Sequence, residues 1–136
     1  MMGRWQEIDH TADLALRLWG DDLEDLFATA ARGMFALLVD LEHIPLVEER
    51  WLTLQAADVE ILLVDWLNEL LYWGERGGLA AYREFKFVEL TPTSLRVRVR
   101  GGPVIAYHGY IKAATFHNLE VRVTEAGYET EIVFDM

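Results

Sequence analysis

The sequence predicts an α+β fold in which mostly antiparallel strands form sheet layers and two amphipathic helices pack on one face. Two segments carry apolar residues at helical spacing, whereas most other apolar residues alternate with polar ones over short runs. These short runs follow one another through turns instead of alternating with helices, which favours antiparallel pairing. We therefore expect six or seven strands. The length of 136 residues fits one domain spanning residues 1–136.

The first two predicted strands flank a polar stretch near the N-terminus. Alternation of polar and apolar residues predicts strands over residues 4–10 and 14–19. Residues 9–13, Asp-His-Thr-Ala-Asp, lie where the first strand ends and the second begins. A sheet holds the backbone of such a stretch while its side chains reach outward, so functional sites are commonly built there. The alternative is an ordinary turn whose aspartate and threonine side chains bond their own backbone.

Two helices follow from the apolar spacing and from acidic N-caps. The first is expected over residues 23–38, after an N-cap at Asp22 or the aspartate before it. The second is expected to begin after the N-cap Asp58 and to end at Gly74 or the glycine three residues later. Asn68 lies on its polar side, where the acidic pair Asp65 and Glu69 is expected to face solvent.

The second half of the chain is predicted to be strand and turn. Residues 101–109, which begin with Gly-Gly-Pro, are expected to form an irregular surface segment. Residues 110–117 are interpreted as a strand rich in small residues, and Val123 is expected to be buried in the strand that follows. Further strands are predicted over residues 50–56, 82–90, 95–100, 119–123 and 128–135.

One predicted strand carries the only basic stripe in the sequence. Arg96, Arg98 and Arg100 recur at period two, opposite the apolar side of residues 95–100. One interpretation is phosphate contact, and the other is an outer sheet face paired with neighbouring acids. We favour the second, because the interleaved aromatic residues of a nucleic-acid platform are missing.

Composition excludes several classes of site. The formal net charge is −11, which disfavours direct binding of RNA or DNA because phosphate backbones are repelled at long range. The sequence has no cysteine, which removes disulfides and thiolate metal sites. No segment approaches the about 18 apolar residues that predict a membrane span, and the N-terminal residues lack the apolar run of a signal peptide. We therefore expect a cytoplasmic protein with no membrane partner.

Three acidic or terminal groups could form a cation site if the chain ends meet. A final strand that runs to the last residue would hold Asp135 and the terminal oxygens of Met136 in place. With Asp13 nearby, these oxygens would converge, and converging carboxylates repel unless a cation or proton lies between them. Oxygen ligands without thiolates select calcium, magnesium or manganese. His10 could add an imidazole, although a histidine beside a turn more often only donates hydrogen bonds.

Motifs of free-standing enzymes are missing from the sequence. It has no Gly-x-Ser-x-Gly elbow, no glycine-rich phosphate loop and no His-Glu-x-x-His motif. Lys112 precedes two alanines, which leave room for a close approach, so its ammonium could bind phosphate or hold an acidic cluster. It could equally be an ordinary strand lysine.

Four motifs, in this order, resemble the archease family over essentially the whole chain. They are His-Thr-Ala-Asp at 10–13, Leu-Leu-Val-Asp-Trp-Leu-Asn-Glu-Leu-Leu at 62–71, Lys-Ala-Ala-Thr-Phe-His at 112–117, and Val-Phe-Asp-Met at 133–136. Two positions depart from the family pattern. Ala15 stands where the family usually has glycine, and Met136 stands where it usually has a β-branched residue.

The resemblance implies a non-catalytic protein cofactor of the RtcB-type RNA ligase, the enzyme that joins RNA ends in tRNA splicing and RNA repair. Such a cofactor promotes guanylylation of the ligase's catalytic histidine, supports multiple turnover and can broaden the nucleotide that the ligase accepts. Carried over by position, the metal site falls on Asp13, Asp135 and Met136, with calcium expected first and manganese or magnesium as alternatives. The residue important for ligase activation falls on Lys112, and His10 would support the metal ligands.

Two other functions stay open from the residues alone. A stand-alone metal-dependent phosphoesterase could use the same carboxylates. A general chaperone or interaction domain could bind basic clients through the acidic surface without any metal.

Overall fold

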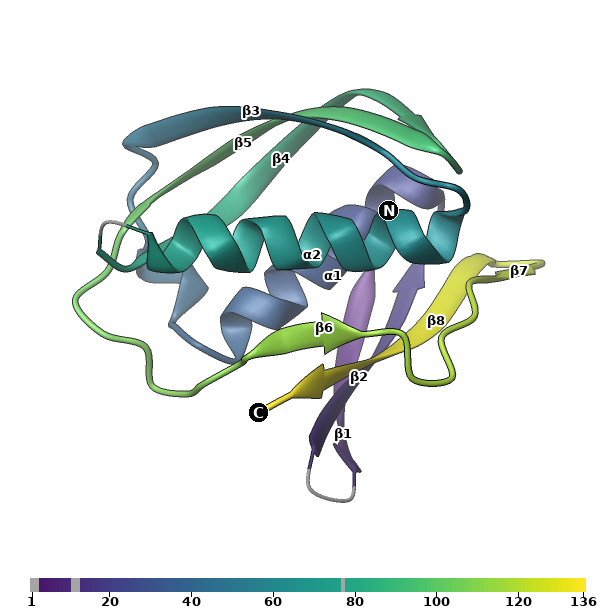
Figure 1. The fold of residues 1–136 in the computed structure, drawn as a ribbon, viewed down its shortest axis with the longest axis horizontal. Helices are drawn as coiled ribbons and strands as arrows, with labels where there is room; N and C mark the ends of the chain where they lie inside the picture. Colours follow the sequence, from purple (N-terminus) through teal and green to yellow (C-terminus); the bar gives the residue numbers. More distant parts are fainter. Residues whose placement is uncertain (1–2, 11–12, 77) are drawn as a thin grey trace.

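The computed structural model describes residues 3–10, 13–76 and 78–136, in which two helices lie between two antiparallel sheets (Figure 1). The elements in chain order are β1 (Arg4–His10), β2 (Asp13–Gly20), α1 (Leu23–Ala36), the 3-10 helix η1 (Leu41–His43), β3 (Glu48–Gln55), α2 (Val59–Glu75), β4 (Ala80–Thr91), β5 (Ser94–Pro103), β6 (Ala113–Thr115), β7 (Arg122–Thr124) and β8 (Gly127–Asp135).

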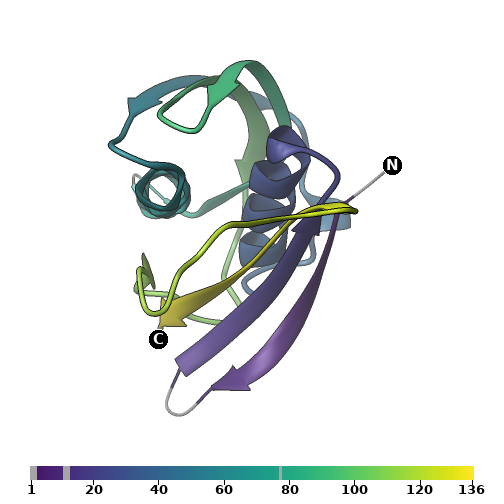
Figure 2. The ribbon, with the colours of Figure 1, turned by 90° about the vertical axis from the view of Figure 1, so that its right-hand side faces the viewer.

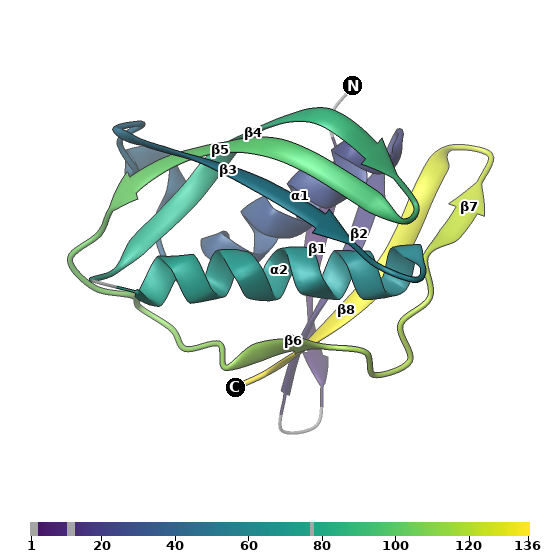
Figure 3. The same ribbon diagram turned by 45° about the horizontal axis from the view of Figure 1, so that its top comes forward.

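The strands divide between two sheets. One sheet has the order β1-β2-β8-β6, with β7 paired to β8, and the other has the order β3-β5-β4. Helix α1 contacts β2 and β4, and α2 contacts β4 and β6, so the helices cover one face of each sheet (Figures 2 and 3). The α+β class is therefore confirmed. The described residues form eight strands instead of six or seven, and two of them, β6 and β7, have only three residues each.

Both helices begin at the predicted aspartate caps. The carboxylate of Asp22 accepts a hydrogen bond from the Asp25 N–H at 2.7 Å, and that of Asp58 accepts from the Ile61 N–H at 2.8 Å. These bonds satisfy N–H groups that have no partner within the first turn of a helix. Helix α1 ends at Ala36, before the predicted limit, because the chain tightens there and the Leu38 N–H donates to the Phe35 carbonyl at 2.9 Å.

Gly74 is buried inside α2 and does not end the helix, which continues to Glu75. A Cβ at position 74 would lie 2.5 Å from the Tyr107 hydroxyl, closer than carbon and oxygen can approach. The glycine thus marks a close contact between α2 and the loop that precedes β6. The second glycine considered as a stop, at position 77, lies outside the described residues.

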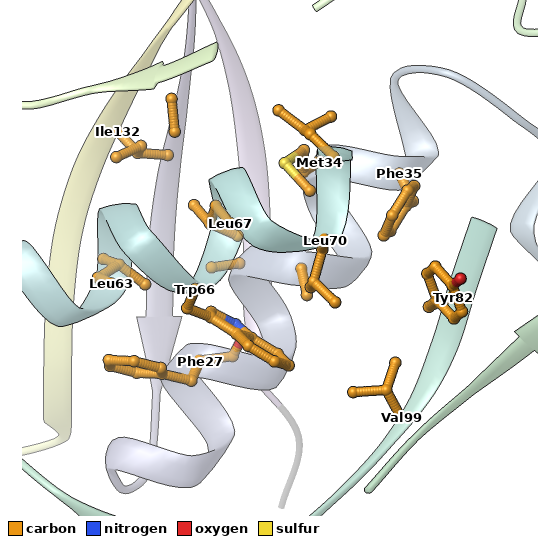
Figure 4. Packing of buried hydrophobic residues seen from close by; sticks show 14 of the residues in the cluster. Phe27, Met34, Phe35, Leu63, Trp66, Leu67, Leu70, Tyr82, Val99 and Ile132 are labelled. Atoms are coloured by element: carbon orange, nitrogen blue, oxygen red, sulfur yellow. The ribbon is translucent and has the colours of Figure 1, made fainter. Parts of the chain in front are cut away.

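The core lies between the helices and both sheets (Figure 4). Trp66 of α2 is fully buried, and its indole N–H donates to the Phe27 carbonyl of α1 at 3.0 Å. Its ring lies edge-on to Phe85 of β4, with centroids 5.5 Å apart. Trp66 therefore joins both helices to the three-stranded sheet.

Tyr107 ties the loop before β6 to α2 and β4. Its hydroxyl lies 2.8 Å from the Gly74 carbonyl oxygen and 2.6 Å from that of Ala80, and it can donate to either. Burial raises the pKa of Tyr107 to about 12, because the phenolate is poorly solvated there, and the charge of Glu75 adds to the shift.

Tyr107 should make stability depend on pH above its ordinary pKa of 10.0. A raised pKa in the folded state means that its contribution is complete below pH 10 and is lost as the pH rises toward 12. In chemical denaturation at neutral pH, Tyr107→Phe should lose about 1 kcal/mol of unfolding free energy. The difference between wild type and this variant should shrink from pH 10 to 12, and a constant difference would contradict the assignment.

Three predictions in the second half of the chain differ from the structure. Strand β5 runs through Gly101 and Gly102 to Pro103, because absence of a Cβ at Gly101 lets the β4 backbone at Ala81 pass close by. Val123 is 75% exposed, because β7 pairs only with the start of β8, beyond the cover of the helices. Of the strand expected over residues 110–117, only β6 forms.

In the described part of the chain, no helix is both long and apolar enough to cross a bilayer.

Candidate functional site

The ends of three neighbouring strands gather the predicted site residues. Strand β2 pairs with β8 so that Leu14 lies opposite Phe134, and β6 pairs with β8 so that Ala113 lies opposite Asp135. Continuing the first register by one residue places Asp13 opposite Asp135. The two acidic motifs, separated by most of the chain, therefore meet at one end of the five-stranded sheet.

Asp13 and Asp135 lie on the same face of that sheet, and this pair of aspartates is called the acidic row below. Directly opposite residues of antiparallel strands have Cβ atoms about 5 Å apart and point to the same side. Phe134 is fully buried toward the helices, so strand alternation directs the Asp135 side chain to the other face, where it is exposed. Two carboxylates at this spacing repel each other, and a cation between them would relieve the repulsion.

The backbone of Lys112 lies beside Asp135 on the other side of β8. Its backbone N–H donates to the Asp135 carbonyl at 2.8 Å, and its side chain is exposed. Ile111, directly before it, is buried and anchors this approach to the core. Met136 follows Asp135 directly and is 49% exposed. Figure 1 shows this end of β8 next to β6.

For His10, only the backbone position relative to the acidic row is described. Its backbone lies opposite Asp13 in the β1–β2 register. The side chains of Asp9 and His10, as well as Thr11 and Ala12, lie outside the described residues. The supporting role expected for His10 therefore stays a prediction.

The donor set suits a hard cation and not a soft one. Within residues 3–10, 13–76 and 78–136, no three His, Cys, Asp or Glu side chains are placed to hold a metal ion. A cation at this row would therefore bind the carboxylates of Asp13 and Asp135 together with main-chain or solvent oxygens. Calcium, magnesium and manganese accept such mixed oxygen ligands.

Asn68, which the sequence places on the polar side of α2, has a specific partner in the structure. It is partly buried, and its amide binds the backbone of Ala114 in β6. The only signal in the sequence is its position at the border of the apolar face, between Leu67 and Leu70.

The arginine stripe forms the outer face of the three-stranded sheet, as favoured from the sequence. Arg100 lies 3.1 Å from Glu84, Arg98 lies 3.6 Å from Glu49, and Arg96 lies over the Trp51 ring. Exposed ion pairs of this kind contribute little stability, at most about 1 kcal/mol. Neighbouring acids thus offset much of the positive charge of the stripe.

The arrangement of the chain agrees with known proteins. The Archease protein family (MTH1598/TM1083) profile matches residues 5–136. A protein archease from Methanopyrus kandleri is 34% identical over 97% of this chain and 99% of its own length. One from Archaeoglobus fulgidus is 35% identical over 98% of this chain and 99% of its own length.

Solved structures show the same architecture. The solution structure of Methanobacterium thermoautotrophicum protein 1598 has a TM-score of 0.78 and 27% identity, covering 97% of this chain and 98% of that one. The crystal structure of an archease from Thermotoga maritima, described as a possible chaperone, has a TM-score of 0.71 and 25% identity, covering 96% of both chains. With the profile match across both the acidic row and the helices, these findings show that the chain belongs to the archease family.

Proposed function

We propose that this chain is a cytoplasmic, non-catalytic cofactor of an RtcB-type RNA ligase. In this role it promotes guanylylation of the ligase's catalytic histidine, supports repeated turnover in tRNA splicing and RNA repair, and broadens the nucleotide that the ligase accepts. The observation that carries the proposal is the meeting of Asp13, Lys112 and Asp135 at the ends of β2, β6 and β8. Membership of the archease family supports it.

Within this proposal, Asp13, Asp135 and a main-chain oxygen of Met136 hold a divalent cation, with calcium first and manganese or magnesium as alternatives. The bound cation would supply positive charge where a phosphoryl group is transferred. The two carboxylates fix its place, since β2 and β8 are rigidly paired through Leu14 and Phe134. The exposed ammonium of Lys112 would bind a phosphate oxygen of the nucleotide from the adjacent strand.

The surface chemistry favours a protein partner over RNA. The net charge of −11 opposes contact with a phosphate backbone, and the outward arginines are largely paired with Glu49 and Glu84. The acidic row at the end of a rigid sheet can enter a partner's nucleotide pocket without any contact between this chain and RNA. Direct RNA binding is therefore not part of the proposal.

The test is a multiple-turnover assay with a purified RtcB-type ligase, GTP, a divalent cation and RNA ends, whose joining consumes the guanylyl group. Adding the wild-type chain should raise the turnover rate of the ligase at least about tenfold, which corresponds to about 1.4 kcal/mol in the stimulated step. The matched control is Glu131→Gln, which alters a partly exposed acid on the same strand β8. A wild-type chain that leaves the turnover rate unchanged would contradict the proposal.

The same preparations separate the two alternatives. The description of the Thermotoga maritima archease as a possible chaperone favours an interaction role without a metal. Suppression of client aggregation that survives in Asp13→Ala, without ligase stimulation by wild type, would support that role. Hydrolysis of a phosphate ester by the chain alone with manganese would instead support a stand-alone phosphoesterase.

A further inference from the structure

Strand β6 directly follows Lys112, and one side chain of α2 binds the backbone of this strand. The Asn68 side-chain oxygen accepts a hydrogen bond from the Ala114 N–H at 2.8 Å. Its side-chain nitrogen donates to the Ala114 carbonyl at 3.2 Å. One amide group therefore satisfies both polar backbone atoms of a single residue in β6.

This pairing takes the place of a neighbouring strand. Strand β6 has only three residues and lies at the end of the order β1-β2-β8-β6. So short an edge strand gains little from pairing with β8 alone, and its outward backbone groups need partners. The Asn68 amide provides a donor and an acceptor in the same geometry as a strand, so β6 is held on both sides.

The support behind Asn68 is rigid. Helix α2 has 17 residues, and Leu67 and Leu70, on either side of Asn68, are fully buried. Trp66 further fixes the helix through its bond to the Phe27 carbonyl. The position of Asn68 is therefore set by the core and not by the exposed end of the sheet.

We propose that Asn68 is a positioning residue that holds β6 in register and so keeps Lys112 beside Asp135. Ala113 lies opposite Asp135, and Lys112, two residues before Ala114, donates its N–H to the Asp135 carbonyl. A shift of β6 would move the Lys112 ammonium relative to the carboxylates. The functional part of this inference rests on the proposed activation of the ligase.

Few other side chains could make both hydrogen bonds to the Ala114 backbone. Aspartate matches asparagine in size and can accept from the Ala114 N–H, but its carboxylate cannot donate to the Ala114 carbonyl. Leucine has a similar shape and can make neither bond. The pair Asn68→Asp and Asn68→Leu thus removes one bond and then both, and Asp65→Asn is a matched control on the exposed side of the same helix.

The first experiment measures amide hydrogen exchange, which needs neither ligase nor metal. In Asn68→Leu, the Ala114 and Lys112 amides should exchange at least about tenfold faster, which corresponds to loss of a hydrogen bond. The Leu16 amide in β2 should keep the wild-type rate, and Asp65→Asn should match wild type throughout. In Asn68→Asp, the Ala114 amide should exchange more slowly than in Asn68→Leu. Unchanged exchange in Asn68→Leu, or an equal increase at Leu16, would overturn the inference.

The second experiment measures ligase guanylylation with the same variants at a temperature where all are folded. Asn68→Leu should lower the stimulated rate at least about fivefold, with Asn68→Asp between it and wild type, because a misplaced charge loses most of its effect. Full stimulation by Asn68→Leu, despite faster exchange at Lys112, would overturn the positioning role. If wild type itself gives no stimulation, the proposed function fails, whereas the exchange result still decides whether Asn68 positions β6.

Discussion

Replacing Asp13 and Asp135 together by asparagine should lower the affinity for Ca²⁺ by about a hundredfold or more, because both side-chain carboxylate ligands are lost. The fold should remain, since Leu14 and Phe134 keep the pairing of β2 with β8. The measurement is titration calorimetry with Ca²⁺ and with Mn²⁺, together with the thermal midpoint of each variant without metal. Removing two carboxylates that repel each other should leave that midpoint unchanged or raise it.

The control for this prediction is Glu131→Gln, which removes a carboxylate from the same strand outside the acidic row. Its Ca²⁺ affinity should match wild type. If the double variant binds Ca²⁺ as tightly as wild type does, the acidic row does not hold the cation. Added chelator should also lower the thermal midpoint of a Ca²⁺-loaded wild type and leave that of the double variant unchanged, since ligand binding stabilises only the state that binds.

Trp66→Ala should destabilise the fold by about 3–5 kcal/mol, because the removal of a fully buried indole leaves a large cavity. The variant also loses the bond to the Phe27 carbonyl and the edge contact with Phe85. Urea denaturation followed by far-UV circular dichroism measures the loss directly. A decrease of this size approaches the whole stability of an ordinary domain.

The matched control is Trp51→Ala on the outer face of the three-stranded sheet. Trp51 is 50% exposed and lies beside the Arg96 guanidinium, so its loss should cost about 1 kcal/mol or less. Equal destabilisation by the two substitutions would contradict the placement of Trp66 at the junction of both helices and the sheet.

The local elements of this fold could be predicted because their signals are local. Asp22 and Asp58 cap the helices through bonds to residues three positions later, which a short window of sequence contains. The inward side of β5 followed equally from period-two alternation, and Leu95 and Val97 are fully buried.

The division into two sheets could not be predicted in this way. Alternation shows which face of a strand is apolar, but it does not show which distant strand pairs with it. The short strands β6 and β7 were harder still to predict from the sequence, because side chains from the distant helix α2 help to position them. Asn68 binds Ala114 across 46 positions, and Glu60 accepts from the Val121 N–H across 61.

The candidate site was predicted residue by residue through resemblance and not through geometry. Nothing in the spacing of Asp13 and Asp135 shows that β2 and β8 are neighbours, yet their register brings these residues together. The resemblance singled out Lys112, but only the fold shows that its N–H donates to the Asp135 carbonyl. Asn68 was missed because its partner is a backbone, whose position no side-chain pattern reveals.

The central claim is that Asp13, Lys112 and Asp135 act together on a ligase. Its most direct test is multiple-turnover guanylylation of an RtcB-type ligase with Lys112→Ala, measured beside the double variant and Glu131→Gln. Lys112→Ala should bind Ca²⁺ with no more than a modest change in affinity and should return the rate to that of the ligase alone, whereas Glu131→Gln should stimulate fully. Full stimulation by both Lys112→Ala and the double variant would contradict the account.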